Sequence, residues 1–339
     1  MVTFLVIGDP HFKTGTLHRS EVMIDEIIKL LSSSKPDIIV CLGDVLDRFA
    51  NIRQEALSQA VDFFKLLQTH APTYILVGNH DRPNNAVFLT DEHPFNAVKY
   101  WEPIPYPITI VDFPIESIIE GMSFIFAPYT PNGRFIEALD HLSSWKTSKL
   151  IFAHQDFFGA IYNQQKSETG DRWEKSFPTV ISGHIHDYQE LSKNIIYIGA
   201  PIQHAFNESP EKSCSWITVT PDSIKCERLF IQSPIYWTYK IHVNDIKSFI
   251  PPKLPKHSDM KLVIEGTFSE IKGLNKIAKV KEWNKQGIRI QPMVKTDAST
   301  SAIIPKNNGT KIIHKPFIVY LKESIQDNSD LLSLLTKIT

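Results

Sequence analysis

Hydrophobic residues recur in two alternating patterns along the first 80 residues. Short apolar runs rich in β-branched residues stand at 3–8 (TFLVIG), 37–43 (DIIVCLG) and 73–78 (TYILVG). Each run is typical of a strand that is buried on both faces. Residues 20–34 and 51–70, which lie between these runs, place apolar side chains at helical spacing. The resulting βαβαβ order predicts parallel strands joined by right-handed crossovers.

The strand pattern continues to about residue 232. A last pair of apolar runs predicts a terminal antiparallel hairpin, and the whole segment predicts a layered α/β sandwich. We see no internal repeat. The further strand-like runs are MSFIFAPY (122–129), KLIFAHQ (149–155), FPTVISGH (177–184), IIYIGAP (195–201), and the hairpin pair SWITVTP (215–221) and IKCERLFIQ (224–232).

The pattern breaks after residue 232 and predicts a domain boundary. The segment SPIYW is followed by PPKLPKHS (251–258), a Pro/Lys-rich connection that indicates a linker. KLVIEG, a lysine-rich amphipathic stretch and IRIQPMV then predict a small α+β module. We therefore expect a first domain at 1–235, a small second domain at 236–315, and a tail at 316–339 with apolar residues at helical spacing.

Composition adds the cellular setting and a charge asymmetry. With 42% hydrophobic and 22% charged residues, the chain is typical of a soluble globular protein. We identify neither a signal peptide nor an apolar run long enough to span a membrane. Residues 1–120 hold 9 basic and 16 acidic side chains, whereas 253–289 hold 9 basic and 4 acidic ones. The acidic part suits metal binding and the basic part suits phosphate, with a solvated surface as the alternative reading.

The cysteines favour a reducing compartment. Cys41, Cys214 and Cys226 are odd in number and lack the close spacing of a zinc site, so we expect an intracellular protein. Cys214 and Cys226 could also face each other across the predicted hairpin and form a disulfide.

Polar side chains follow five of the strand-like runs, at the point where each run ends. In an open α/β sheet the loops after the carboxyl ends of the strands meet at one rim, so distant residues come together. Carboxylate, carboxamide and imidazole groups that converge are what a site for two divalent cations needs. The candidates are Asp9 and His11 in GDPH, Asp44 and Asp47 in GDVLD, Asn79, His80 and Asp81 in GNHD, His154 in AHQ, and His184 and His186 in GHIH.

Each motif has an ordinary structural alternative. A single DxH is more often a turn with a solvated histidine, and His154, which has no partner in its own motif, could be a core histidine. The five motifs in this order, each at a strand end, favour a site instead. The histidines that lack such context are read as structural or surface residues: His18, His70, His93, His141, His242, His257 and His314.

The ordered set DxH, GDxxD, GNHD, H and GHxH, over residues 1 to about 230, resembles the calcineurin-like metallophosphoesterase superfamily. The resemblance implies a layered α/β/β/α sandwich with a small α+β capping domain. It also implies that His80 lies beside the scissile phosphate and that Asp47 is its orienting carboxylate. The implied metal ligands are Asp9, His11 and His186 on one ion, Asn79, His154 and His184 on the other, and Asp44 between them.

The resemblance also suggests how phosphate is attacked. Two divalent ions would activate a bridging water, and His80, as a cation, would stabilise or protonate the departing oxygen. Manganese is the expected metal, with magnesium, iron or zinc as alternatives. Arg48 and Arg82 flank the site in sequence and are candidates for bidentate contacts to phosphate, with surface ion pairs as the alternative.

The substrate class is indicated by two further segments. YIGAPIQHAFNES (197–209) and HQDFFGA (154–160) resemble the SbcD-type DNA double-strand-break repair nucleases, including phage and large-virus homologues. This resemblance implies a manganese-dependent DNA exo- or endonuclease subunit that acts in repair or recombination. Its partners would be DNA and an SbcC-type SMC-like ATPase, with the tail as a docking helix, and the first two helices would form a homodimer.

Two alternatives stay open at this stage. GDVLDRF and GNHD depart from the patterns of serine/threonine phosphatases, and DPHFK departs from the DxHLG common in cellular SbcD-type nucleases. The first alternative is a metal-dependent phosphatase or small-molecule phosphodiesterase. The second is a binding module that has kept the fold without the activity.

Overall fold

Two six-stranded sheets form the main body of the protein. The computed structural model describes residues 1–295 except 50, 163 and 164. In the first sheet the order is β14-β13-β1-β2-β3-β4, and β1 to β4 run parallel to one another. Its strands are β1 (Val2–Ile7), β2 (Ile38–Cys41), β3 (Thr73–Leu76), β4 (Ile108–Val111), β13 (Ser213–Val219) and β14 (Ile224–Phe230).

The second sheet repeats this arrangement with different strands. Its order is β11-β12-β10-β7-β6-β5, and the four central strands are parallel. A separate two-stranded hairpin consists of β8 (Ile161–Tyr162) and β9 (Gln165–Lys166). The strands of the sheet are β5 (Ile115–Ile119), β6 (Met122–Ala127), β7 (Leu150–Ala153), β10 (Thr179–Ser182), β11 (Gln189–Ser192) and β12 (Ile195–Tyr197).

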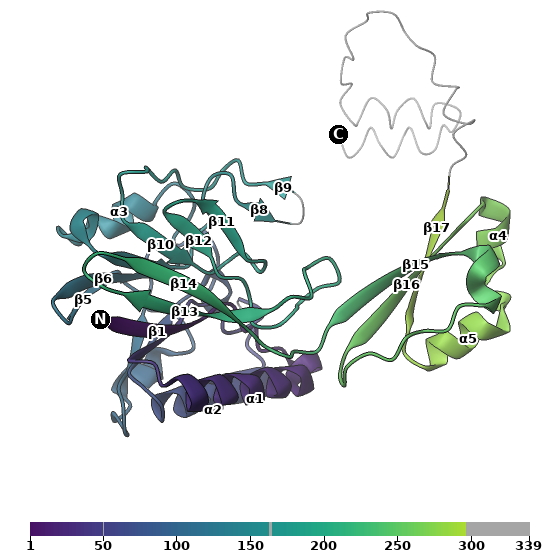
Figure 1. Cartoon of the computed structure of the whole chain (residues 1–339), viewed down its shortest axis with the longest axis horizontal. Helices are drawn as coiled ribbons and strands as arrows, with labels where there is room; N and C mark the ends of the chain where they lie inside the picture. Colours follow the sequence, from purple (N-terminus) through teal and green to yellow (C-terminus); the bar gives the residue numbers. More distant parts are fainter. Residues whose placement is uncertain (50, 163–164, 296–339) are drawn as a thin grey trace, which may run out of the picture. The chain divides into compact units, whose positions relative to one another are not determined.

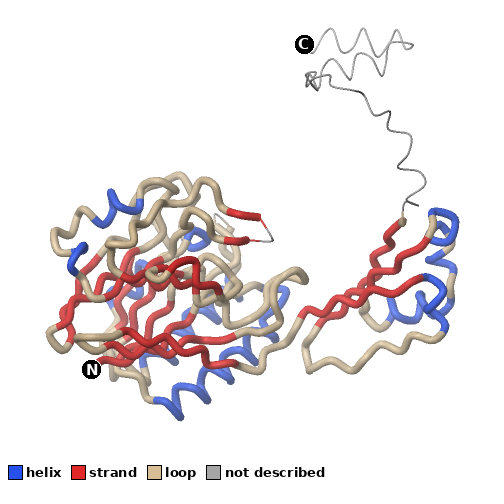
Figure 2. Tube along the Cα trace, turned by 45° about the horizontal axis from the view of Figure 1, so that its top comes forward, coloured by secondary structure: helices blue, strands red, loops and turns tan. Residues whose placement is uncertain are grey.

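Helices cover the outer faces of the sheets, and the predicted α/β/β/α sandwich is confirmed. Helices α1 (Leu17–Ser34) and α2 (Gln54–Gln68) pack their apolar stripes on the first sheet (Figures 1 and 2). The short helix α3 (Phe135–Leu139) and neighbouring loops pack on the second sheet. Within the described part of the chain, no helix is both long and apolar enough to cross a membrane. Short 3₁₀ helices lie at Thr14–Thr16, Asn79–Asp81, Asn96–Tyr100, Trp145–Thr147, Val243–Lys247 and Leu274–Lys276.

The two sheets meet in a core of aromatic and branched side chains. Along β1, Leu5 and Ile7 contact the helix layer, whereas Phe4 and Val6 point toward the second sheet. The Phe4 ring lies 5.0 Å from the rings of both Phe124 and Phe152. Because both faces of β1 are buried, its sequence reads as a continuous apolar run rather than an alternating one.

The predicted antiparallel hairpin is formed by β13 and β14, but its cysteines do not face each other. Cys214 pairs with Leu229 and Cys226 pairs with Ile217, so the two thiols are three residues out of register. All three cysteines are free. The disulfide alternative is therefore wrong.

A small module with its own core follows the hairpin. Strands β15 (Tyr236–His242), β16 (Asp259–Gly266) and β17 (Arg289–Val294) form a three-stranded sheet, and β15 runs parallel to β16. Helices α4 (Phe268–Lys272) and α5 (Ala278–Lys285) belong to the same module, whose core includes Trp283.

The internal order of this module differs from the sequence-based expectation. Strand β15 was not predicted, and the Pro/Lys-rich segment 251–258 lies between β15 and β16 rather than at a boundary. Residues Met1–Met293 form one compact unit, and the domain boundaries placed at 235 and 315 stay predictions. The predicted tail at 316–339 lies outside the described residues.

The inter-sheet core makes a testable contribution to stability. We expect Phe4→Ala to lower the free energy of unfolding by about 3–5 kcal/mol, because a fully buried ring between two sheets leaves a cavity. Urea denaturation followed by circular dichroism measures this change. Phe113→Ala removes a ring that is 48% exposed and serves as the control, with an expected loss below about 1 kcal/mol. Equal losses in the two variants would contradict the assignment.

Candidate metal centre

The five motifs converge where the parallel strands of both sheets end. Asp9 and His11 follow β1, Asp44 follows β2, and Asn79 and His80 follow β3, all in the first sheet. The loops after β7 and β10 of the second sheet bring His154, His184 and His186. The rim expected from a single sheet is therefore built from two, because the sandwich places the carboxyl ends of both parallel sets together.

Two imidazoles meet in the first cluster with their lone pairs facing each other. His11 Nδ1–H donates to the carbonyl of Leu46 (3.1 Å), and His186 Nδ1–H donates to Glu208 Oε1 (2.9 Å). In each ring the other nitrogen, Nε2, is then an acceptor, and the two Nε2 atoms lie 3.1 Å apart. Asp9 contributes Oδ2, a buried oxygen without a hydrogen-bond partner.

The second cluster shows the same convergence of oxygen and nitrogen atoms. His154 Nδ1–H donates to the carbonyl of Leu42 (2.8 Å), so Nε2 is the nitrogen that faces the other groups of the cluster and can hold either a proton or an ion. That nitrogen lies 3.0 Å from Asn79 Oδ1 and 3.3 Å from Asp44 Oδ1. His184 Nδ1 lies 2.9 Å from the same Asn79 oxygen.

The lone pairs of these oxygen and nitrogen atoms repel one another unless a proton or a metal cation lies among them, and a bound metal would take the place of the proton that His154 Nε2 otherwise holds. Asp44 reaches both clusters, since its Oδ2 lies 3.5 Å from His11 Nε2 and its Oδ1 lies near His154. Oxygen and imidazole donors of this kind suit divalent ions, so the residues present fit two metals with Asp44 between them. Their roles as ligands stay predictions.

The electrostatics of the centre also favour positive charge. Burial lowers the pKa of His154, but Asp44 and Asp9 beside it outweigh burial and raise that pKa to about 9. Burial would raise the pKa of Asp44, yet the surrounding histidines hold it well below its usual value. Asp44 therefore remains a carboxylate, and its neighbourhood stabilises a cation.

The backbone is strained where it presents these groups. His11, Asp44 and His184 adopt positive φ values of 45°, 47° and 79°, which non-glycine residues rarely adopt outside functional sites. Gly78 has an ordinary φ of −81° but is needed for close approach, because a Cβ there would lie 2.3 Å from Asp44 Oδ1.

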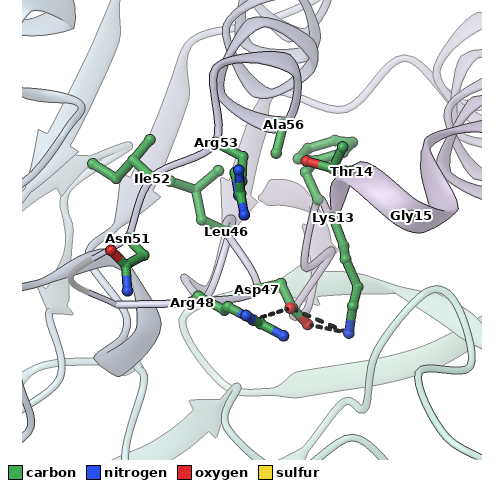
Figure 3. Close-up of a pocket in the computed structure, with 11 residues that line it drawn as sticks. Lys13, Thr14, Gly15, Leu46, Asp47, Arg48, Asn51, Ile52, Arg53 and Ala56 are labelled. Atoms are coloured by element: carbon green, nitrogen blue, oxygen red, sulfur yellow. Dashed lines mark hydrogen bonds and ion pairs between the residues drawn. The ribbon is translucent and has the colours of Figure 1, made fainter.

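His80 is oriented by a main-chain oxygen and not by the predicted carboxylate. Its Nδ1–H donates to the carbonyl of Asp47 at 2.7 Å, and its Nε2 lies 4.0 Å from Asp44 Oδ2. The Asp47 side chain instead pairs with Lys13 and Arg48, at 3.2 and 3.6 Å (Figure 3). The aspartate therefore orients His80 through its backbone carbonyl, while its carboxylate forms ion pairs with the side chains of Lys13 and Arg48.

The two arginines proposed as phosphate ligands differ in position. Arg48 is exposed beside Asp47, where it remains a candidate. Arg82 is 3% exposed, and its guanidinium donates to the carbonyls of Tyr129, Val87 and Phe88. Because these hydrogen bonds hold the guanidinium against the loop at 87–88, Arg82 has a structural role in this structure, and its predicted contact with substrate stays without support.

The Asp81 side chain connects two of the loops that carry the candidate ligands. Its carboxylate accepts backbone N–H groups from Val45, Leu46 and Gly78 at 2.9–3.1 Å. These bonds lock the loop after β2 to the loop after β3, and so fix Asp44 relative to Asn79 and His80. Burial and the nearby Asp44 charge raise the pKa of Asp81 to about 6.

Comparison with known proteins places this centre in a family. The family model described as calcineurin-like phosphoesterase matches residues 2–188. The chain belongs to the calcineurin-like phosphoesterase family. Putative phosphoesterase 078R of Invertebrate iridescent virus 3 is 33% identical over 97% of this chain and 93% of its own length. Putative phosphoesterase 244L of Invertebrate iridescent virus 6 is 36% identical over 80% of this chain and 96% of its own length.

In this phosphoesterase, sequence reasoning missed a second layer of residues around the ligands. Glu208 accepts from His186 Nδ1, from the His204 backbone N–H (2.9 Å) and from Lys212 Nζ (3.0 Å). The Lys212 side chain is 1% exposed and also donates to the His186 carbonyl (2.9 Å). The segment 197–209 was noted only for its resemblance, since no spacing rule links a loop glutamate to a histidine 22 residues earlier.

His204 was also missed. Its ring lies 4.7 Å from that of His11 and 5.0 Å from that of His186, so a third imidazole flanks the first cluster. Of the histidines read as structural, His93 pairs with Asp112, and the His18 ring lies 4.9 Å from the His257 ring in a tilted arrangement. His314 lies outside the described residues.

The Glu208 contact predicts a specific loss of metal affinity. Glu208→Gln removes the charge that fixes the His186 tautomer, so we expect Mn²⁺ affinity to fall about 10- to 100-fold. Isothermal titration calorimetry of the folded variant measures this change, and thermal unfolding reports its stability separately. Glu211→Gln changes an exposed glutamate three residues away and should bind Mn²⁺ like the wild type. Unchanged affinity in Glu208→Gln would remove the residue from the centre.

Proposed function

We propose that the protein is a two-metal phosphodiesterase that cuts DNA with Mn²⁺ as its preferred ion. The observation that carries the phosphodiesterase part is the position of Asp44 between two clusters of acceptors, with His80 alongside. This arrangement would accommodate two divalent cations, with His80 beside them as the group that transfers a proton. Both are what in-line displacement at phosphorus requires.

The residues of the chain divide the chemistry among them. Bound divalent ions would supply a Lewis acid for phosphoryl oxygens and lower the pKa of a water. Because His80 Nδ1–H is committed to the Asp47 carbonyl, Nε2 is the atom that can carry a proton to the departing oxygen. A cavity of about 350 Å³ lined by Asp44, His80, His184 and His186 gives the phosphate access to these groups.

Support for a nucleic-acid substrate comes from the charge of the small module. The lysines of its helical face, Lys272, Lys276, Lys281 and Lys285, are exposed and suit a polyanion. The proposal extends to a role in repair or recombination with an SbcC-type ATPase, for which the segment 316–339 would be the docking element. A homodimer through α1 and α2 is part of the same proposal.

A comparison of two substrates tests the proposed function. A labelled linear duplex and a bis-nitrophenyl phosphodiester are each incubated with Mn²⁺ or Mg²⁺. We expect Mn²⁺-dependent degradation of the duplex, with rates that fall steeply between 50 and 200 mM salt because several phosphates are contacted. Hydrolysis of the small ester alone, without salt dependence, would identify a small-molecule phosphodiesterase or phosphatase. Loss of both activities in metal-loaded protein would point to a binding module.

The orientation of His80 predicts unequal effects of two substitutions. His80→Ala should lower kcat about 10²- to 10⁴-fold while Mn²⁺ affinity stays within about threefold, because His80 is not among the converging acceptors. Asp47→Asn should lower kcat less than about tenfold, since the carbonyl that holds His80 is retained. Steady-state kinetics on the small ester measure both. If Asp47→Asn were as damaging as His80→Ala, the carboxylate would be the orienting group after all.

A further inference from the structure

We infer that a second cavity beside the metal centre is a binding subsite for one nucleotide of the substrate, next to the phosphate that is cut. The cavity measures about 440 Å³, and the residues that line it include His11, His204, Phe206, Tyr236 and Arg289. This inference rests on the proposed function and adds a base-binding site to it.

The position of the cavity links it to the reacting phosphate. His11 belongs both to the first cluster of acceptors and to the cavity wall. A larger cavity of about 750 Å³ adjoins this one, because Lys13 and Asp47 line both cavities. A strand whose phosphate lies at the metal centre would therefore place its neighbouring nucleotide here.

The walls combine the two features that hold a nucleotide. Phe206 and Tyr236 form an aromatic pair with ring centroids 4.8 Å apart, and Phe206 is only half-buried. Arg289 lies with its guanidinium 5.3 Å from the Phe206 ring, and Lys13 is 47% exposed. Aromatic rings stack on bases of any identity, and neighbouring cations attract the phosphates on either side.

The wall is held rigidly before any ligand binds. Arg19, which is 1% exposed, lies with its guanidinium 3.9 Å from the Tyr236 ring and donates to the carbonyls of Pro234 and His257 (3.1 and 2.9 Å). Gln203, which is 2% exposed, exchanges hydrogen bonds with the backbone N–H and carbonyl of Tyr236. A preformed aromatic wall reduces the ordering cost of binding.

His204 gives the cavity a polar group of defined character. Its Nε2 lies 2.9 Å from the Asp9 carbonyl, and a carbonyl only accepts, so Nε2 carries the proton. Nδ1 is then an acceptor, and no hydrogen bond from another described residue engages it. A sugar hydroxyl or a base amino group is the complementary donor.

The size of the cavity suits a single nucleotide. Small-ligand sites commonly measure about 300–1,000 Å³, with apolar walls and a few placed polar groups. A cavity of about 440 Å³ lies in the lower part of that range and so suits a small ligand such as one base with its sugar. Because an aromatic wall binds the face of a base, the ligand class is a nucleotide whose base is unstacked, which duplex DNA supplies only at an end or after local opening.

Binding of 2-aminopurine deoxyribonucleoside 5′-monophosphate to Mg²⁺-loaded protein tests this subsite without any need for cleavage. Stacking quenches its fluorescence, and deoxyribose 5-phosphate, which lacks the base, serves as a competitor. We expect the nucleotide to bind the wild type at least tenfold more tightly than the sugar phosphate. Phe206→Ala should weaken the nucleotide about tenfold and leave the sugar phosphate unchanged, whereas Phe206→Tyr should restore binding.

Charge is tested in the same titration. Arg289→Ala should weaken both ligands a few-fold, whereas Lys193→Ala, an exposed lysine between β11 and β12 that does not line the cavity, should change neither. Equal affinity for the two ligands in the wild type, or equal weakening of both by Phe206→Ala, would overturn the subsite.

The outcomes also separate this inference from the proposed function. Base-dependent binding without hydrolysis of any phosphodiester would keep the subsite and remove the activity. Degradation of DNA without base-dependent binding would keep the nuclease and remove the subsite.

Discussion

The constraint on which the rest of the structure depends is the meeting of oxygen and imidazole ligand atoms around Asp44, which only a proton or a metal cation between them can hold together. Three histidine rings each donate one N–H to a carbonyl or carboxylate oxygen, and this commitment leaves their second nitrogens to face carboxylate, carboxamide or imidazole groups. A buried arrangement of this kind is unfavourable by itself and becomes favourable with cations. The fold therefore has to supply enough stability elsewhere to hold these groups in place.

That stability comes from the two sheets and from the links between their loops. The inter-sheet core fixes the ends of β1, β2, β3, β7 and β10 relative to one another, and Asp81 then joins two of the loops through three backbone hydrogen bonds. With the strand ends fixed in this way, residues such as His11 and Asp44 can hold positive φ values that a free loop would relax. The rigid scaffold is thus what allows the backbone strain at the site to persist.

Much of this could be predicted from the sequence, for identifiable reasons. Strands buried on both faces leave continuous apolar runs, and polar residues directly after them mark the edge of a sheet, so the sandwich and the convergence of the five motifs were readable. Contacts made by the backbone leave no such trace: the carbonyl of Asp47 orients His80, and the carbonyls that hold Arg82 have no residue signature. Strand β15 was missed because it follows a proline-containing break and has few fully buried positions. Glu208 and His204 lie in an irregular loop, where spacing carries no information about contacts.

The residues that could be predicted from the sequence and those that could not have different functions in the molecule. The predicted metal ligands lie at strand ends, within the region that matches the phosphoesterase family. The cavity walls are built from loops and from the small module: Arg48, Asn51 and Ile52 line one cavity, and Phe206, Tyr236 and Arg289 line the other. Because loops and appended modules tolerate change without disturbing the sheets, they are where one metal centre can be fitted to different phosphate esters. Substrate choice in this protein should therefore be sought in the walls around His11 and not among the ligands themselves.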